Sequence, residues 1–312
     1  MALLWQKFEI KENLISMKGI GILVNILSVL VAGGFGVMLR GKLKTQYQSI
    51  IYRILGLVVF GVGVYEFTEH FFVLSGKQLE LEGSLLAVVA LVVGALLGYA
   101  FDMEGGLLKI GKSLSKKDVA EREKETKRLD RLNRAVSASI DKGITLPKVS
   151  LLDRLPTYDM PSSYSGVMYA DGFLFTLILL SANSMLFSGV MADGLSGETT
   201  VLLYKSGIDF LVCFGMSMIC GSAPMYAILP MIFIDAFVYI GCMLLPDQMS
   251  SFFTPSLTGQ LGVIGAVIMV ILGIQMAFGR KNPKAANLVP AFTIPILYEL
   301  LMLLITKLIA KE

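Results

Sequence analysis

Long apolar runs separated by short polar segments dominate the sequence. Each run has about 20 residues, the length that a helix needs to cross a hydrocarbon core of about 30 Å. They cover approximately residues 19–39, 50–74, 83–101, 172–190, 206–245 (two runs), 259–278 and 287–309. Gly221 and Pro224 divide the longest stretch into two runs. The pattern predicts an all-α, polytopic transmembrane helix bundle of about eight spans, with seven and nine as alternatives.

Residues 188–210 interrupt this pattern. The stretch is rich in glycine and carries four charged side chains, Asp193, Glu198, Lys205 and Asp209. A helix in lipid keeps its backbone bonded internally, and each charged side chain in it is costly. We therefore expect this stretch to be broken, re-entrant or exposed to water. We predict that it lies outside, between the fourth and fifth spans, with Lys205 at the membrane boundary.

Composition supports a membrane protein and excludes several kinds of active site. The chain has 312 residues, of which 55% are hydrophobic and 16% charged, against about 25% charged in soluble domains. A single histidine, His70, excludes a multi-histidine metal site and a Ser-His-Asp triad. The three cysteines lie in apolar runs, which favours buried free thiols. The sequence has no phosphate-binding glycine loop of the Walker type, which argues against an ATP-driven pump. We expect no enzyme, no cofactor and no metal.

The distribution of charge indicates the orientation of the chain in the membrane. Residues 102–165 hold 13 of the 27 Lys and Arg residues and 10 Asp and Glu residues, and prolines follow the charged part. With eight spans and both termini extracytoplasmic, 20 of the 27 basic residues lie on the cytoplasmic side, as the positive-inside rule requires. This asymmetry predicts a multi-pass membrane protein.

Four segments follow from this arrangement. Residues 17–101 form a first membrane block of three spans, residues 102–165 a cytosolic charged helix with a Pro-containing linker, and residues 166–312 a second membrane block of about five spans. Residues 1–16 are too short and too charged to span. They are either an extension before a native start at Met17 or a short interfacial helix.

Several motifs resemble the YqgA/YdfK family of uncharacterised bacterial inner-membrane proteins, a family with a domain of unknown function. They are MKGIGILVNILSVLVAGGFG near the start, LVVGALLGYAFDMEGGLLKIGKSL before the charged segment, ADGLSG with YKSGID in residues 188–210, and AANLVPA near the end. The resemblance covers most of the apolar sequence. It implies a fold and a location in a bacterial inner (plasma) membrane, and it implies no activity.

The residues that match the family pattern are Asn25, Asp102, Glu104, Gly189, Asp193, Gly194, Lys205, Ser206, Asp209, Asn287 and Pro290. Two features depart from that pattern. Asn183-Ser184-Met185 stands where the family usually has Gly-Ala-Met, which affects the size or polarity of a pocket. Residues 116–165 resemble an insertion, which says little about the membrane core.

Six polar residues are candidates for a transport pathway or polar cluster: Asn25, Asp193, Lys205, Asp209, Asp235 and Asn287. Asp209 follows Lys205 by four residues and shares its helix face; a structural ion pair is the alternative. Asp235 is the acid deepest in a span. Asp193 is interpreted more simply as part of an external turn. Glu66 and His70, also four apart, are interpreted as interfacial.

The sequence leaves three hypotheses of function. The first is a small-solute or ion transporter, and the alternative is a non-transport membrane scaffold or sensor that acts through residues 102–165. The third is an intramembrane aspartyl protease with Asp209 and Asp235, but the segment lacks a Gly-x-Gly-Asp signature. As partners we expect the lipid bilayer and a small solute or ion, but no nucleic acid; homo-oligomerisation stays open.

Overall fold

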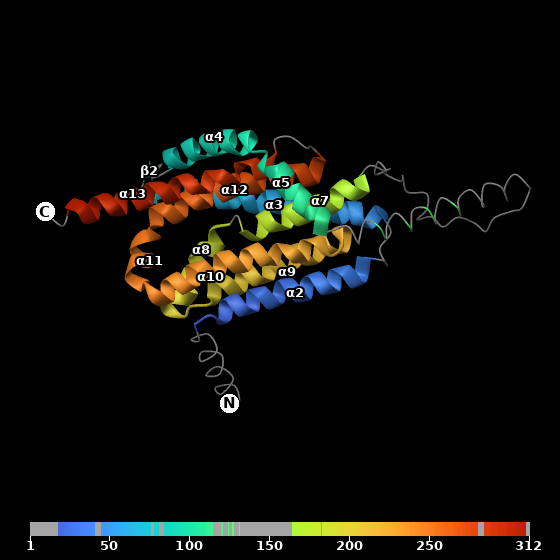
Figure 1. The fold of residues 1–312 in the computed structure, drawn as a ribbon, viewed down its shortest axis with the longest axis horizontal. Coiled ribbons are helices and arrows are strands. Elements are labelled where there is room, and N and C mark those ends of the chain that lie inside the picture. The colour runs from blue at the N-terminus through green and yellow to red at the C-terminus, as the bar shows by residue number, and fades with distance from the viewer. Residues whose placement is uncertain are drawn as a thin grey trace, which may run out of the picture.

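Helices form nearly all of the computed structural model, which describes residues 18–40, 45–75, 78–80, 84–114, 164–181, 183–279 and 284–309, with isolated positions at 120, 124, 127 and 131. The helices in chain order are α2 (Ile20–Arg40), α3 (Thr45–Phe71), α4 (Ser84–Ala100), α5 (Met103–Leu114), α7 (Tyr164–Ser181), α8 (Ser184–Ser196), α9 (Thr200–Cys220), η2 (Ala223–Ala227), α10 (Ile228–Leu244), α11 (Pro246–Phe252), α12 (Pro255–Phe278), η3 (Ala285–Phe292) and α13 (Thr293–Ile309). Two three-residue strands, β1 (Val73–Ser75) and β2 (Gln78–Glu80), pair antiparallel. Figure 1 shows the long helices aligned in one elongated bundle.

Length and composition confirm the predicted class of fold. Six helical segments in the described part of the chain are long and apolar enough to cross a membrane. The pairs α4–α5 and α7–α8 bend by 59° and 51°, and counting each pair as one span raises the number to eight. The chain is therefore an all-α bundle with six to eight candidate membrane spans.

Two close helix pairings form the centre of the bundle. Helix α2 runs parallel to α9, because Gly21 lies against Leu202 while Gly36 lies against the backbone of Phe214. A Cβ added to Gly36 would come within 2.6 Å of the Phe214 carbonyl oxygen. Helix α3 runs antiparallel to α12, with Gly56 against Met276. Glycines permit such approaches in lipid, where dispersion contacts rather than water drive helix association.

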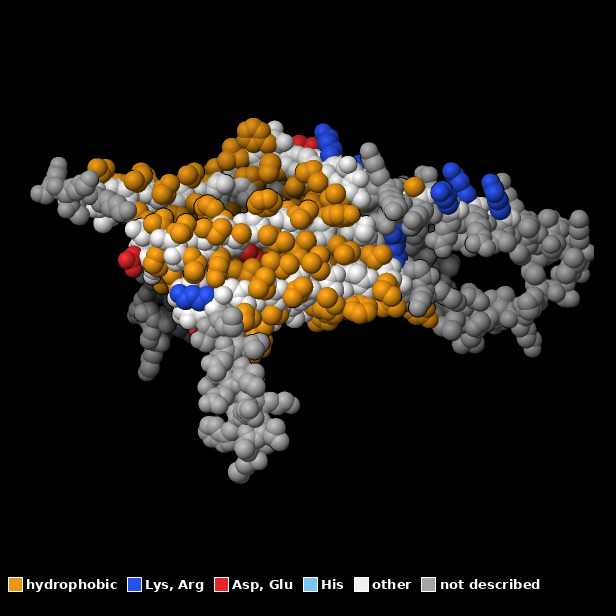
Figure 2. All heavy atoms as spheres, turned by 60° about the horizontal axis from the view of Figure 1, so that its bottom comes forward, with side chains coloured by type: hydrophobic (Ala, Val, Ile, Leu, Met, Phe, Trp, Pro, Cys, Tyr) orange, Lys and Arg blue, Asp and Glu red, His pale blue; other side chains and the backbone are white. Residues whose placement is uncertain are grey.

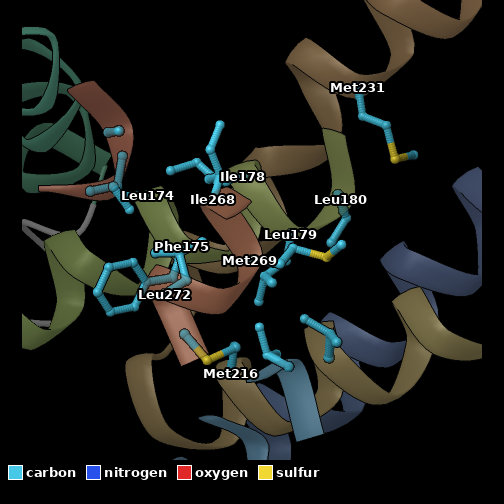
Figure 3. Close-up of a cluster of buried hydrophobic side chains, with 14 of the residues drawn as sticks. Leu174, Phe175, Ile178, Leu179, Leu180, Met216, Met231, Ile268, Met269 and Leu272 are labelled. Carbon is cyan, nitrogen blue, oxygen red and sulfur yellow. The ribbon is translucent and has the colours of Figure 1, made fainter. Parts of the chain in front are cut away.

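The hydrophobic core lies between α7, α9, α10 and α12. Figure 3 shows side chains from these helices converging, among them Leu174 and Ile178 of α7, Met216 of α9, and Ile268 of α12. The outward faces are also apolar. Phe233 and Phe237 of α10 are 77% and 78% exposed, and Figure 2 shows hydrophobic side chains spread over the described surface. An apolar surface of this extent suits lipid rather than water.

The charged stretch at residues 188–210 is less broken than its composition suggests. Helix α8 continues to Ser196, Gly197 ends it with φ 75° in the left-handed region, and α9 begins at Thr200. A second break separates α7 from α8, where the Asn183 side chain accepts a hydrogen bond from Leu186 N at 3.0 Å. The span predicted over residues 172–190 is therefore bent at Asn183, whose side chain caps a new helix.

The start of α2 and the end of α13 lie at the same end of the bundle. Gly19 approaches Tyr239 near the end of α10, and α13 contacts α11, which follows α10. An even number of crossings is consistent with this arrangement, while the side that faces the cytoplasm stays a prediction. The expectations for residues 1–16, and for most of residues 115–163, lie outside the described residues.

Candidate functional site

Helix α9 carries an ion pair inside the bundle. Lys205 and Asp209 are one helical turn apart and form a salt bridge, and their side chains are 1% and 3% exposed. Lys205 is one of the largest fully buried side chains in the described structure. Lys205 is therefore buried against neighbouring helices, while its place at the membrane boundary stays a prediction. Removing either partner of such a pair leaves a costly uncompensated charge.

Helices α2 and α10 add two polar side chains beside this pair. Asn25 of α2 lies within hydrogen-bonding reach of Asp209. Its Nδ2 lies 4.0 Å from the sulfur of Met231, one turn before Asp235 on α10. Asp235 is within electrostatic range of both Lys205 and Asp209. We call Asn25, Lys205, Asp209 and Asp235 the polar cluster.

The polar cluster is incompletely satisfied. Asn25 and Asp235 are 0% and 1% exposed. Neither carboxylate oxygen of Asp235 has a hydrogen-bond partner among the described residues, nor does Oδ1 of Asn25. Buried polar groups nearly always have partners, because an unpaired one costs free energy. Two carboxylates beside one ammonium also leave the cluster one positive charge short of neutrality when all three are ionised, so it can attract a cation, a proton or a polar solute.

Asp193 stands apart from the polar cluster. It lies in the last turn of α8 and is fully buried. Its carboxylate accepts hydrogen bonds from Gly19 N at 2.8 Å and from Ile22 N at 3.4 Å. The interpretation of Asp193 as an external turn residue is therefore wrong. Its carboxylate satisfies the free N–H groups at the start of α2, where the helix dipole also favours negative charge.

Asn287 lies at the other end of the bundle, where η3 meets the bend between α4 and α5. Its Oδ1 accepts a hydrogen bond from Glu104 N at 2.9 Å, and Glu104 in turn accepts one from Ala286 N at 3.3 Å. Nearby, Lys284 donates to Asp102 at 3.2 Å, which raises the pKa of the Lys284 ammonium. These contacts join the two segments, so Asn287 holds a bend in place and does not extend the polar cluster.

Glu66 has a hydrogen-bond partner that the sequence pattern does not reveal. Its side chain is buried, and it accepts hydrogen bonds from Oγ of Ser184 at 2.8 Å and from N of Ser184 at 3.4 Å. His70 lies 4.0 Å away from the same carboxylate oxygen. The available signal was an acid and a histidine at i and i+4 in an apolar run. The partner on α8 was not visible, because no helix break was expected there.

Comparison with known proteins defines the family. The family described as "Protein of unknown function (DUF554)" matches residues 20–300. The chain belongs to this family. Its similarity to the uncharacterised protein YqgA of Escherichia coli (strain K12) is 21% identity over 273 residues, covering 87% of this chain and 92% of the relative. It is also similar to the uncharacterised membrane protein YdfK of Bacillus subtilis (strain 168), with 19% identity over 275 residues, which covers 88% of this chain and 93% of the relative. No solved structure matches.

Family membership confirms the predicted resemblance and supports a membrane protein of a family without a defined function. It assigns no chemistry to the polar cluster. The described residues contain no group of three or more His, Cys, Asp or Glu side chains that could hold a metal ion. The feature of the described structure that bears most directly on function is therefore the polar cluster.

Proposed function

We propose that this protein is a transporter of a small solute or ion in the bacterial inner membrane, and not an enzyme. The observation that carries the proposal is Asp235, an acid in the middle of α10 whose two carboxylate oxygens have no partner among the described residues. An acid at the centre of a spanning helix costs about 2.5–3.5 kcal/mol on insertion scales. Ionisable residues in such positions mark substrate, ion or proton pathways by default.

Breaks in the neighbouring helices support this proposal. Helix α9, which carries Lys205 and Asp209, starts directly after the break that follows Gly197. Helix α10 starts after the 3-10 segment η2. Discontinuous helices beside buried charged groups are a recurring feature of secondary transporters, because they allow one part of a bundle to move against another.

A protease is less compatible with the same residues. A catalytic aspartate pair shares one proton between two carboxyls, because like charges at short range cannot both ionise. Here Asp209 instead forms a salt bridge with Lys205. The scaffold or sensor hypothesis depends on residues 102–165, and most of residues 115–163 lie outside the described structure.

Reconstitution tests the proposal. Purified protein in sealed proteoliposomes is supplied with panels of inorganic ions, amino acids, organic acids and sugars, under proton and sodium gradients. We expect protein-dependent flux of at least one compound. Asp235→Asn should abolish this flux, whereas Asp247→Asn, which changes an exposed acid on α11, should retain it. Folded wild-type protein that moves none of these compounds would contradict the proposal.

A further inference from the structure

Three oxygen atoms of the polar cluster are buried acceptors without donors. Two belong to the carboxylate of Asp235 on α10 and one to the carboxamide of Asn25 on α2, as judged over the described residues. Asn25 contacts Met231, which lies on α10 one turn before Asp235. Two helices thus bring oxygen ligands to one region of the bundle.

Neighbouring hydroxyl donors are already used elsewhere. Oγ of Ser206, next to Lys205, donates to the Leu202 carbonyl at 2.6 Å. Oγ of Ser28, one turn after Asn25, donates to the Ser206 carbonyl at 2.9 Å. The ammonium of Lys205 donates to Asp209. Both hydroxyls and the ammonium thus have acceptors other than the three free oxygens.

The charge and the type of ligand select the class of ion. The cluster offers oxygen ligands only, which suit hard cations rather than soft transition metals. Lys205 compensates one of the two nearby carboxylates, so a single positive charge completes the balance. A monovalent cation provides that charge, whereas a divalent cation would leave a buried excess of positive charge.

We infer that the polar cluster binds one Na⁺-type alkali cation, with the Asp235 carboxylate and the Asn25 carboxamide oxygen as its protein ligands. This inference rests on the proposed transport function and names its coupling ion or its substrate. Lys205 is a positioning residue in this site. With the cation bound, its ammonium pairs with Asp209 alone. Without the cation, the same ammonium is shared between the two acids, as the base among the described residues that interacts with both.

Equilibrium measurements on purified full-length protein test the inference. Thermal stability in detergent is titrated with NaCl, LiCl or KCl against choline chloride at constant ionic strength, and the binding of radioactive sodium gives the stoichiometry. We expect saturable stabilisation by Na⁺ with one ion per chain. Asp235→Asn should abolish it, and Asn25→Ser should weaken affinity by about tenfold or more. The matched control is Asp193→Asn, a buried acid with backbone donors, which should retain Na⁺ binding.

Three results would overturn the inference. The first is equal stability of the wild type in Na⁺ and in choline, which decides the matter even if Asp235→Asn fails to fold. The second is an undiminished Na⁺ response in folded Asp235→Asn. The third is a stability that changes with pH but not with Na⁺ at any pH between about 6 and 9, because the site would then take only a proton. Flux without sodium binding would refute the sodium site but not the proposed transport function. Sodium binding without flux would support the site and refute the transport function.

Discussion

Lys205 is predicted to contribute more to stability than its salt-bridge partner. Replacing Lys205 by Met leaves Asp209 and Asp235 inside the bundle without an ammonium nearby. Replacing Asp209 by Asn leaves Lys205 within electrostatic range of Asp235, so one base still faces one acid. The two substitutions break the same salt bridge, yet only the first removes the single cation from a cluster with two acids.

The sizes of the two effects follow from this difference in charge. Leaving an uncompensated buried charge costs about 3–5 kcal/mol, which is the expected loss in the free energy of unfolding for Lys205→Met. Asp209→Asn keeps a polar side chain of the same size and loses mainly one charged hydrogen bond, so about 1–3 kcal/mol is expected. Adding Asp209→Asn to Lys205→Met removes one of the two unpaired acids. The double variant should therefore be more stable than Lys205→Met alone.

Reversible unfolding in mixed detergent micelles, followed by circular dichroism, measures all three variants. Lys205→Arg, which keeps the positive charge, is the control and should lose the least stability. If Asp209→Asn costs as much as Lys205→Met, Lys205 does not interact with Asp235. If the double variant is the least stable of the set, the removal of an unpaired charge does not govern its stability. Either result would refute the argument for a shared ammonium.

Further predictions concern the packing and the helix ends. Gly36→Ala should cost about 1–3 kcal/mol through overpacking against α9, whereas Gly34→Ala, with no atom within 4 Å of its added Cβ, should leave the denaturation midpoint unchanged. Asn287→Ala should cost about 1 kcal/mol by leaving the partly buried N–H of Glu104 without its acceptor, measured by the same unfolding assay. Asp193→Ala should cost about 0.5–2 kcal/mol by removing the acceptor at the start of α2. Amide exchange at the first turn of α2 should increase in that variant, and an unchanged exchange rate would exclude the capping role.

Apolar length and periodicity were sufficient to predict the class of fold. A spanning helix needs a continuous apolar run, which can be identified without knowing which helices pack against it. The interruptions were harder to place. Composition placed a broken segment over all of residues 188–210, whereas the break itself occupies only the few residues around Gly197. Isolated charged side chains are costly in a buried helix, but Lys205 and Asp209 form a salt bridge with each other within one turn of α9.

The membership of the polar cluster could be predicted only in part. The spacing of Lys205 and Asp209 identifies a shared helix face, since it depends on neighbours in sequence. Asn25 interacts with Asp209, more than 180 residues away in sequence, and Asp235 interacts with Lys205 and Asp209, more than 20 residues away. No local pattern encodes these pairs. Asp193 and Asn287 are candidates by residue type and by their match to the family pattern, and their actual partners are backbone groups of other helices. Helix packing, which brings these groups together, is not visible in the pattern of a single span.

The positions of the acids explain why Asp235 differs from the rest. Asp193 accepts N–H groups at the start of α2, Glu66 accepts from Ser184 at the start of α8, and the half-buried Glu104 accepts from Ala286 in η3. Helix starts provide free N–H groups and a favourable dipole, so these carboxylates are satisfied by the fold itself. Asp235 lies within α10, where backbone N–H groups are already bonded to the preceding turn. Among these buried or half-buried acids, Asp235 is therefore the one without a hydrogen-bond donor among the described residues, which supports the proposal that a bound ion compensates it.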